Sequence, residues 1–328
     1  MRVVITGGAG FIGTNLTHRW VRAHPDDSVT VLDALTYAGR RESLVDIENH
    51  RSFRFVRGDI CDRSAVESTL EGADLVVHLA AESHNDRAVR EPMPFVRTNV
   101  VGTATLLEAC RKLDIPRFHH VSTDEVFGSL SLEDPTKFTE QTAYRPRGPY
   151  SASKASADHL VRAWHETYGL PVTISNCSNN FGPYQYPEKL IALAITRLLS
   201  GGRVPLYGDG LHVRDWIFVE DHCDALDLIA HRGALGRTYL VSAGQELPNV
   251  EVVRRILNHF GRGDDAIERV PDRPGHDRRY SLDASHLREE LGWKPSYDFE
   301  QALTRTIEWY RANQAWWQPL LSPPSASS

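Results

Sequence analysis

The stretch RVVITGGAGFIG, residues 2–13, decides the fold that this sequence predicts. It begins with a short apolar run typical of a buried strand and continues with glycines at positions 7, 10 and 13. A helical pattern of apolar residues then extends to Trp20. A strand, a glycine-rich turn and a helix in this order are typical of folds that bind a dinucleotide at the helix N-terminus. We therefore expect Gly7, Gly10 and Gly13 to contact a cofactor.

A second strand-like run, residues 28–32, ends at Asp33, about 20 residues beyond the last glycine. A carboxylate there accepts a hydrogen bond from a ribose hydroxyl and repels a 2′-phosphate, which favours NAD over NADP. Further strand-like runs at 53–57, 75–79 and 118–122 alternate with helical patterns. This alternation predicts an α/β protein with a Rossmann-type doubly wound parallel sheet.

Polar loops follow the third and fourth of these strands. Asp59 follows the run at 53–57, and Ala80-Ala81-Glu82-Ser83-His84 follows the run at 75–79. In open α/β sheets the ligand crevice lies outside the carboxyl ends of the strands, so these loops are expected at the cofactor. For Asp59 the alternative is a solvated side chain.

The sequence also predicts a second lobe, a smaller α/β unit interleaved with the first. A loop rich in amides, aromatics, glycine and proline follows residue 177, whereas the run at 238–241 is expected to return to the central sheet. We assign residues 1–180 and about 212–243 to an NAD-binding domain. Residues of about 181–211 and 244–328 are assigned to a substrate-binding domain.

Composition narrows the possible partners. The 328 residues carry a net charge of -6, which gives no electrostatic reason to expect nucleic acid or an anionic membrane. The four cysteines are scattered without metal-ligand spacing, so we expect no metal site and a reducing compartment. No apolar stretch is long enough for a signal peptide or a membrane span. The simplest expectation is a cytoplasmic protein.

Two groups of residues indicate chemistry. Tyr150 and Lys154 are spaced to lie on one face of a helix, one turn apart. A tyrosine with a pKa near 10 is a poor base at neutral pH, but an adjacent ammonium and a cationic nicotinamide both favour the phenolate. Because Tyr-x-x-x-Lys is common by chance, its weight comes from the dinucleotide turn in the same chain.

Thr123, Asp124 and Glu125 follow the strand at 118–122. Thr123 suits a hydrogen bond to an alcohol that is being oxidised, and the two acids suit an elimination, one as base and one as acid. An epimerase has no need of them. Neighbours in a strand point to opposite faces, so both acids can reach one substrate only from a turn beyond the strand end. The alternative is a solvated loop or a helix cap.

The ordered motifs resemble one family over essentially the full length of the chain. GGAGFIG, DALTYAG, AAESHNDR, STDEVFG, PYSASKA, NCSNNFGPYQYPEKLI, VRDWIFVEDH and DRPGHDRRY stand in the order found in the NAD-dependent nucleotide-sugar 4,6-dehydratases. These enzymes belong to the extended short-chain dehydrogenase/reductase superfamily. The chain is most similar to members that act on dTDP-glucose.

The resemblance implies a mechanism and a set of contacts. Tyr150 would remove a proton from the C4 hydroxyl, Glu125 the C5 proton, and Asp124 would protonate the departing C6 hydroxyl. Hydride would pass from C4 to NAD and return to C6. Expected cofactor contacts are Phe11, Ile12, Asp33, Thr36, Asp59, Ile60, Ala80, Ser83, Thr98, Tyr150, Lys154 and Asn180. Expected substrate contacts are His84, Thr123, Asn179, Lys189, Leu190, Pro205, Tyr207, Arg214, Asn249, Asp272 and His276.

The chain departs from the family pattern at a few positions. Phe127 stands where Tyr is expected, and Asn85 and Ala88 stand where Val and Ser are expected; we assign none of them a role. The stretch 241–246, near Asn249, differs more and leaves the nucleotide and sugar open. The alternatives are GDP-mannose, CDP-glucose or a UDP-sugar as substrate, an epimerase, or a non-catalytic NAD-sensing regulator.

Two long helices, predicted near 95–113 and 150–168, are rich in small and apolar residues. They are either buried within the domain or form a helix-on-helix contact in a homodimer. The family resemblance favours the homodimer.

Overall fold

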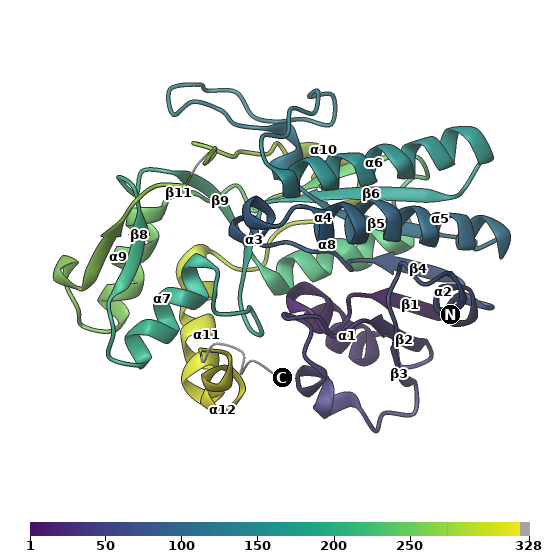
Figure 1. The fold of residues 1–328 in the computed structure, drawn as a ribbon, viewed down its shortest axis with the longest axis horizontal. Helices are drawn as coiled ribbons and strands as arrows, with labels where there is room; N and C mark the ends of the chain where they lie inside the picture. Colours follow the sequence, from purple (N-terminus) through teal and green to yellow (C-terminus); the bar gives the residue numbers. More distant parts are fainter. Residues whose placement is uncertain (274, 322–328) are drawn as a thin grey trace.

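A seven-stranded, wholly parallel sheet forms the centre of the protein (Figure 1). The computed structural model describes residues 1–273 and 275–321. The strand order is β10-β6-β5-β4-β1-β2-β3, so the direction of winding reverses between β1 and β4, and the predicted doubly wound fold is confirmed. The strands are β1 (Arg2–Thr6), β2 (Ser28–Asp33), β3 (Phe53–Arg57), β4 (Leu75–His78), β5 (Phe118–Thr123), β6 (Val172–Cys177) and β10 (Thr238–Val241).

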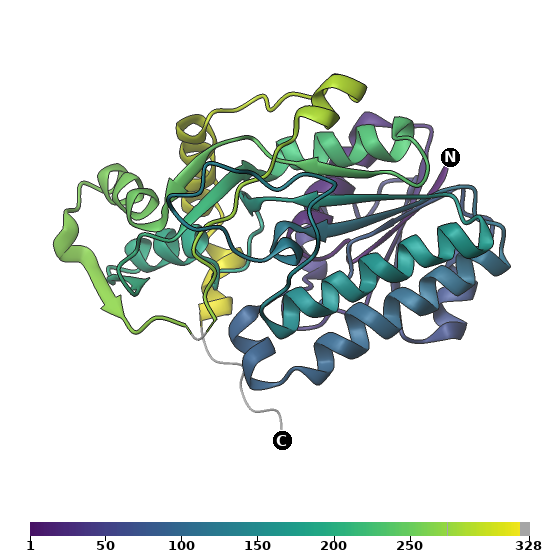
Figure 2. The ribbon, with the colours of Figure 1, turned by 90° about the horizontal axis from the view of Figure 1, so that it is seen from above.

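Helices cover both faces of this sheet (Figure 2). One face carries α1 (Phe11–Ala23) and α8 (Val219–Arg232); the other carries α2 (Arg63–Leu70), α5 (Thr103–Lys112) and α6 (Pro149–Tyr168). Alternate residues of β1 serve the two layers, because Val3 and Ile5 pack towards α1 and Val4 packs towards α2 and α5. Burial on both faces explains why these strands are unbroken apolar runs in the sequence. Among the described residues, no helix combines the length and apolar character that crossing a bilayer requires.

The helix predicted over 95–113 is present, but its middle is not α-helical. It consists of α4 (Met93–Phe95), a π-helical segment η2 (Val96–Gly102) and α5. Asn99 of η2 is buried; its Oδ1 accepts from Glu82 N at 2.9 Å, and its Nδ2 donates to Glu82 O at 3.0 Å and to Ser153 Oγ at 2.8 Å. The wider turn thus lets one amide fasten the loop after β4 to α6.

A smaller lobe lies beyond the carboxyl edge of the central sheet. Its three-stranded sheet has the order β11-β9-β7, and β8 pairs with β12. Its elements are β7 (Asn179–Phe181), α7 (Leu190–Leu199), β8 (Val204–Tyr207), β9 (Val213–Phe218), β11 (Glu246–Pro248), α9 (Asn249–His259), η4 (Asp264–Ala266), β12 (Ile267–Val270), α11 (Phe299–Ala312) and α12 (Gln314–Trp317). The other described helices are η1 (Arg41–Ile47), α3 (Asn85–Arg90), η3 (Asp124–Phe127), α10 (Ser285–Leu291) and η5 (Gln318–Leu321).

The two lobes exchange segments of chain. After passing through the small lobe, the chain returns to pair β10 in parallel with β6, as expected for residues 238–241. β9 pairs within the small lobe, whereas α8, which follows it directly, packs against α1. The division of the chain at residues 180, 212 and 243 stays a prediction.

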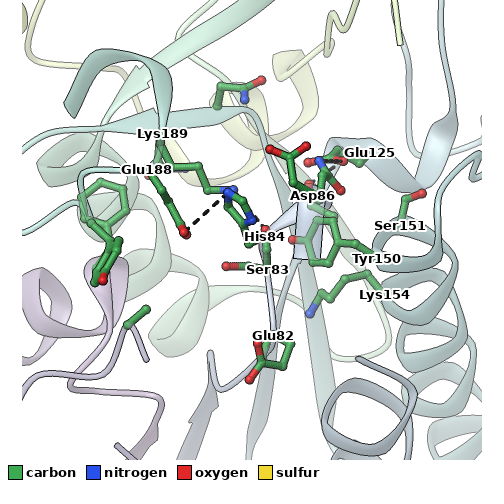
Figure 3. A pocket seen from close by; sticks show the side chains of 18 of the residues that line it. Glu82, Ser83, His84, Asp86, Glu125, Tyr150, Ser151, Lys154, Glu188 and Lys189 are labelled. Carbon is green, nitrogen blue, oxygen red and sulfur yellow. Dashed lines mark hydrogen bonds and ion pairs between the residues drawn. The ribbon is translucent and has the colours of Figure 1, made fainter. Parts of the chain in front are cut away.

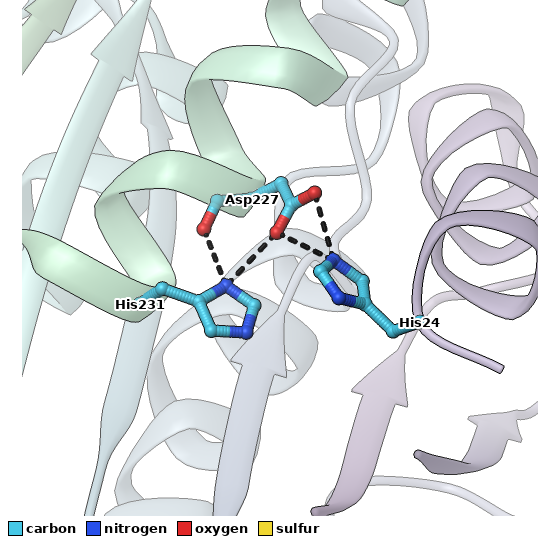
Figure 4. A group of neighbouring side chains, drawn as sticks. All are labelled: His24, Asp227 and His231. Atoms are coloured by element: carbon cyan, nitrogen blue, oxygen red, sulfur yellow. Dashed lines mark hydrogen bonds and ion pairs between the residues drawn. The ribbon is translucent and has the colours of Figure 1, made fainter. Parts of the chain in front are cut away.

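A cluster of three polar side chains ties the end of α1 to the end of α8 (Figure 4). His24 Nε2 lies 3.0 Å from both carboxylate oxygens of Asp227, and His231 Nδ1 lies 2.9 Å from Oδ1. His231 Nδ1 is also 2.8 Å from the main-chain oxygen of Asp227. A carbonyl oxygen only accepts hydrogen bonds, so this nitrogen carries a proton and the cluster is held by hydrogen bonds and charge rather than arranged as metal ligands.

This cluster makes stability depend on pH in a defined direction. Its bonds to Asp227 raise the pKa of His231 above the usual value of about 6.5. The His231 contribution is therefore complete below that value and is lost as pH rises through the higher pKa of the folded state. We expect His231→Gln to lower the melting temperature at pH 6 and to have a much smaller effect at pH 9.

Thermal unfolding of His231→Gln and wild-type protein between pH 5 and pH 9 measures this difference. His259→Gln serves as the control. His259 lies at the end of α9 with its Nε2 3.9 Å from Glu300, and the difference in melting temperature between this variant and the wild type should be similar at every pH. A His231→Gln effect of equal size at every pH would contradict the assignment.

Candidate active site

A cavity of about 810 Å³ opens at the carboxyl edge of the central sheet and extends under the small lobe. Every residue that the sequence assigns to catalysis, cofactor binding or substrate binding lines it. The close view in Figure 3 shows Glu125 and Tyr150 on one side of the His84 ring and Glu188 and Lys189 on the other. The fold thus brings the predicted residues together, while the role of each stays a prediction.

The glycine turn forms a cradle that only glycine can build. Gly7 has a positive φ of 72°, and a Cβ there would lie 2.6 Å from Ala80 N. A Cβ on Gly13 would lie 2.0 Å from Gly7 O. Gly10, the N-cap of α1, leaves the first turn without a side-chain cap, so the helix N-terminus is open to a phosphate.

Asp33, at the end of β2, closes this half of the cavity. Its Oδ2 accepts from Ala9 N at 2.9 Å and its Oδ1 from Leu35 N at 2.8 Å. Each oxygen keeps a lone pair for a ribose hydroxyl, although burial raises the pKa of the carboxyl. The cradle and this acceptor together fit the pyrophosphate and adenosine ribose of NAD.

Tyr150 and Lys154 lie in the first two turns of α6, and both are buried. Lys154 Nζ donates to Val121 O at 2.8 Å, and burial lowers the pKa of its ammonium. Burial, followed by the charge of Glu125, raises the pKa of Tyr150 well above its usual value. The expected lowering by Lys154 is therefore not met in the protein alone, and Tyr150 stays a phenol until further positive charge arrives.

The acid pair lies on a turn beyond the strand, as the sequence requires. β5 ends at Thr123, whose Oγ1 accepts from Glu125 N at 3.3 Å and so caps the 3-10 turn η3. This change of backbone conformation lets Asp124 and Glu125 line the same cavity.

Burial sets the protonation of both acids. It raises the pKa of Asp124 well above the usual value, and the Glu125 charge adds to the effect. Asp124 Oδ1 accepts from Thr123 Oγ1 at 3.2 Å, whereas Oδ2 is buried without a partner among the described residues. Burial also raises the pKa of Glu125, which Lys189 partly offsets. Asp124 is suited to hold a proton and Glu125 to take one.

Asn85 corrects the expectation that this departure from the family pattern has no role. It begins α3, and its Nδ2 donates to Glu125 Oε2 at 3.1 Å. Burial raises the pKa of Glu125, and this bond offsets part of that rise and fixes one of the carboxylate oxygens. A Val in its place, as the family pattern predicts, could not make this bond.

The basic residues predicted to meet a diphosphate are engaged with the protein itself. Arg214 NH2 donates to Asp277 O at 2.8 Å, and its guanidinium lies 4.3 Å from the centre of the Tyr280 ring. Lys189 Nζ donates to Ser83 O at 3.0 Å. These contacts hold both cations at the cavity wall, where an anionic ligand can replace carbonyl oxygens as their partner.

Tyr207, predicted to offer its ring to a nucleobase, instead faces a cation. The Arg273 guanidinium lies 4.2 Å from its ring centre, and Arg273 also pairs with Asp86 at 2.9 Å. Beside it, His276 Nδ1 is 2.7 Å from Asp272 Oδ1.

Sequence reasoning missed several residues of the cavity. Glu188 accepts from the Tyr37 hydroxyl at 2.8 Å and lies 3.5 Å from His84 Nε2, which links the loop after β2 to the loop before α7. Glu188 stands next to Lys189, which was selected, and Arg273 stands in the motif DRPGHDRRY between two selected residues. Their polar character could have marked them, but nothing local showed that the loops meet.

Comparisons with known proteins agree with this geometry. A family model described as GDP-mannose 4,6 dehydratase matches residues 4–306. A dTDP-glucose 4,6-dehydratase of Mycobacterium tuberculosis (strain ATCC 25618 / H37Rv) is 56% identical over 321 residues, which cover 98% of this chain and 96% of that protein. The protein of the same name from Escherichia coli is 46% identical over 350 residues, covering 98% and 96%.

Solved structures give the same result. The crystal structure of DesIV, a dTDP-glucose 4,6-dehydratase from Streptomyces venezuelae with NAD and TYD bound, has a TM-score of 0.95 and 47% identity, covering 98% of this chain and 100% of that one. A UDP-glucose 4-epimerase from Thermotoga maritima has a TM-score of 0.88 and 29% identity, covering 96% and 100%.

The dinucleotide cradle beside the tyrosine and lysine of α6 defines an NAD-dependent enzyme of the extended short-chain dehydrogenase/reductase class. Within this class, the acid pair on η3 points to enzymes that eliminate water. The chain belongs to the nucleotide-sugar 4,6-dehydratase family, whose members are hydro-lyases.

The geometry of the cradle predicts that alanine substitutions at two glycines of the same turn have very different effects on NAD⁺ binding. Gly13→Ala places a Cβ 2.0 Å from Gly7 O, whereas the same change at Gly10 leaves 3.3 Å. We expect Gly13→Ala to weaken NAD⁺ binding by more than about tenfold and Gly10→Ala to weaken it far less. Calorimetric titration of the two variants with NAD⁺ measures this, and equal losses would contradict the account.

Proposed function

We propose that the protein is a dTDP-glucose 4,6-dehydratase, which converts dTDP-glucose to dTDP-4-keto-6-deoxyglucose with loss of water. One observation carries the assignment. Asp124 and Glu125 line the same cavity as Tyr150 and Lys154, at the end of the dinucleotide-binding sheet. An enzyme that only oxidises and reduces a sugar at C4 has no use for this acid pair.

The protein residues divide the reaction between them. Bound NAD⁺ would supply the acceptor for the hydride of C4 and, once reduced to NADH, the donor of that hydride to C6. Tyr150 takes the proton of the C4 hydroxyl, and Thr123, which lines the same cavity, orients the same oxygen. Lys154 keeps positive charge beneath the tyrosine, which favours the phenolate once a dinucleotide is bound.

The acid pair carries out the elimination of water. Oxidation at C4 acidifies the C5 proton, which Glu125 removes with its carboxylate held by Asn85. Asp124 gives its proton to the departing C6 hydroxyl, a role for which its raised pKa is suited. The two groups are adjacent on η3 and line the same cavity, as acid and base for neighbouring carbons of one sugar require.

Identity of 56% to a dTDP-glucose 4,6-dehydratase supports dTDP-glucose over GDP-mannose, CDP-glucose or a UDP-sugar. An epimerase leaves Asp124 and Glu125 unexplained, and a non-catalytic NAD-sensing regulator leaves all five catalytic residues unexplained. Turnover measured across a panel of nucleotide sugars separates these readings. We expect loss of water from dTDP-glucose with a kcat/KM at least about tenfold above that for the other nucleotide sugars. Preference for another nucleotide sugar would overturn the assignment of dTDP-glucose as the substrate. No turnover of any nucleotide sugar would overturn the assignment of the protein as an enzyme.

Changes to the acid pair should separate elimination from oxidation. We expect Glu125→Gln and Asp124→Asn to slow loss of water by about 100-fold or more and to slow oxidation at C4 much less. Single-turnover absorbance at 340 nm follows oxidation, and NMR follows exchange of the C5 proton and formation of product. Glu133→Gln, on an exposed loop, is the control. Equal losses of rate in both half-reactions would show that the two acids have a structural role and not a catalytic one.

The oligomer and compartment are also part of the proposal. We place a homodimer contact on the helices near 95–113 and 150–168, where Val101 of η2 is 50% exposed. The four free cysteines suit a reducing cytoplasm. We expect Val101→Asp to give a monomer in sedimentation and Val45→Asp, at a residue 60% exposed on η1, to leave the dimer intact. Identical behaviour of the two variants would move the contact elsewhere.

A further inference from the structure

Beneath Lys154 lies a buried carboxylate to which the mechanism above gives no task. Asp158 follows Lys154 by one turn of α6 and is completely inaccessible to solvent, as is His120 of β5. His120 Nε2 lies 3.1 Å from Asp158 Oδ1 and 3.5 Å from Lys154 Nζ. His120 Nε2 thus lies between the catalytic ammonium and the carboxylate. Because its proton is donated to Asp158, this nitrogen does not accept from Lys154, and Asp158 acts on the ammonium through its charge.

The second oxygen of Asp158 joins the same network to the strand end. Oδ2 accepts from the Tyr144 hydroxyl at 2.8 Å and from Asn176 Nδ2 at 3.2 Å. Asn176 Nδ2 also donates to the main-chain oxygen of Thr123 at 3.0 Å. One carboxylate thus lies next to both the catalytic Lys154 and the residue that fixes the main chain of Thr123.

Hydrogen bonds keep this carboxylate ionised. Burial alone would raise the pKa of Asp158, but its bond from His120 and the nearby positive charge lower it overall. Arg162, which donates to the Tyr144 hydroxyl at 2.8 Å, is the other cation close to the network, and it lies at the outer end. Lys154 is the cation at the inner end.

The other groups around Lys154 are neutral at neutral pH. Burial lowers the pKa of His120 to about 4 and that of His78, on β4, well below its usual value. Burial raises the pKa of Cys177, on β6, to about 12 and that of Tyr150 well above its usual value. Among the described residues, Asp158 is therefore the ionised group that supports the charge of Lys154, against the effect of burial.

We propose that Asp158 is a positioning residue of the reaction: its negative charge keeps Lys154 charged, and through Asn176 it fixes the end of β5 at Thr123. The role in catalysis rests on the proposed function, because Lys154 matters there for the phenolate of Tyr150. The role in cofactor binding does not require dTDP-glucose as the substrate.

Asp158→Asn tests the charge with almost no change of shape. Loss of the carboxylate removes the support for the Lys154 ammonium, so Lys154 loses its proton at a lower pH. We expect the alkaline limb of the kcat/KM profile to move down by about one pH unit or more. We also expect NAD⁺ affinity, measured by calorimetry on cofactor-free protein, to fall at least about tenfold between pH 7 and pH 9 in the variant and to change little in the wild type.

Tyr144→Phe is the matched control, because it removes a hydrogen bond to Asp158 and leaves the charge in place. It should lower the melting temperature without moving either pH profile. Equal pH shifts in Asp158→Asn and Tyr144→Phe, or no shift in Asp158→Asn, would overturn the proposal. If wild-type protein binds NAD⁺ but does not turn over dTDP-glucose, the proposed function fails while the binding profiles still decide the role of Asp158.

A double-mutant cycle covers the case in which Asp158→Asn folds poorly. Lys154→Met leaves a buried carboxylate with no cation at its inner end, so adding Asp158→Asn to that variant should raise the melting temperature. Destabilisation that simply adds in the double variant would show that the two residues act independently and would overturn the proposal.

Discussion

The end of β5 at Thr123 is the constraint on which the active site depends. Parallel strands bring their carboxyl ends to one edge, so each loop after a strand contributes to a common cavity. At Thr123 the backbone leaves the extended conformation for a 3-10 turn, and two adjacent carboxylates that a strand would send to opposite faces line one cavity instead. The strand end itself is held from below by Asn176 and Asp158.

Burial is the second feature that determines the chemistry of the site, and it favours the neutral form of every titratable catalytic group. It raises the pKa of Asp124, Glu125 and Tyr150 and lowers the pKa of Lys154, which in each case favours the neutral form. Specific partners oppose this tendency in part. The Lys189 charge and the Asn85 amide do so for Glu125, and the Asp158 charge does so for Lys154. A buried acid that keeps its proton and a buried carboxylate that is free to accept one are what an elimination requires.

The sequence predicts much of this arrangement, because the decisive features are local. The glycine spacing, the acid after β2, the position of the acid pair after β5 and the tyrosine and lysine of α6 are all short-range patterns, and their residues line one cavity. The features that were not predicted depend on distant segments. β8 exists because it pairs with β12, more than 50 residues later, and η2 is π-helical around an asparagine that bonds the loop after β4. Asn85 has a partner only because its side chain reaches Glu125, 40 residues later in the chain, and no local pattern encodes that contact.

In the proposed reaction a hydride leaves C4 of the sugar and returns to C6, and the acid pair on η3 expels water between the two transfers. Turnover of dTDP-glucose deuterated at C4, followed by NMR of the product, tests it most directly. We expect deuterium at C6 of the 4-keto-6-deoxy sugar and solvent hydrogen at C5. Deuterium recovered on free dinucleotide, or absent from C6, would contradict it.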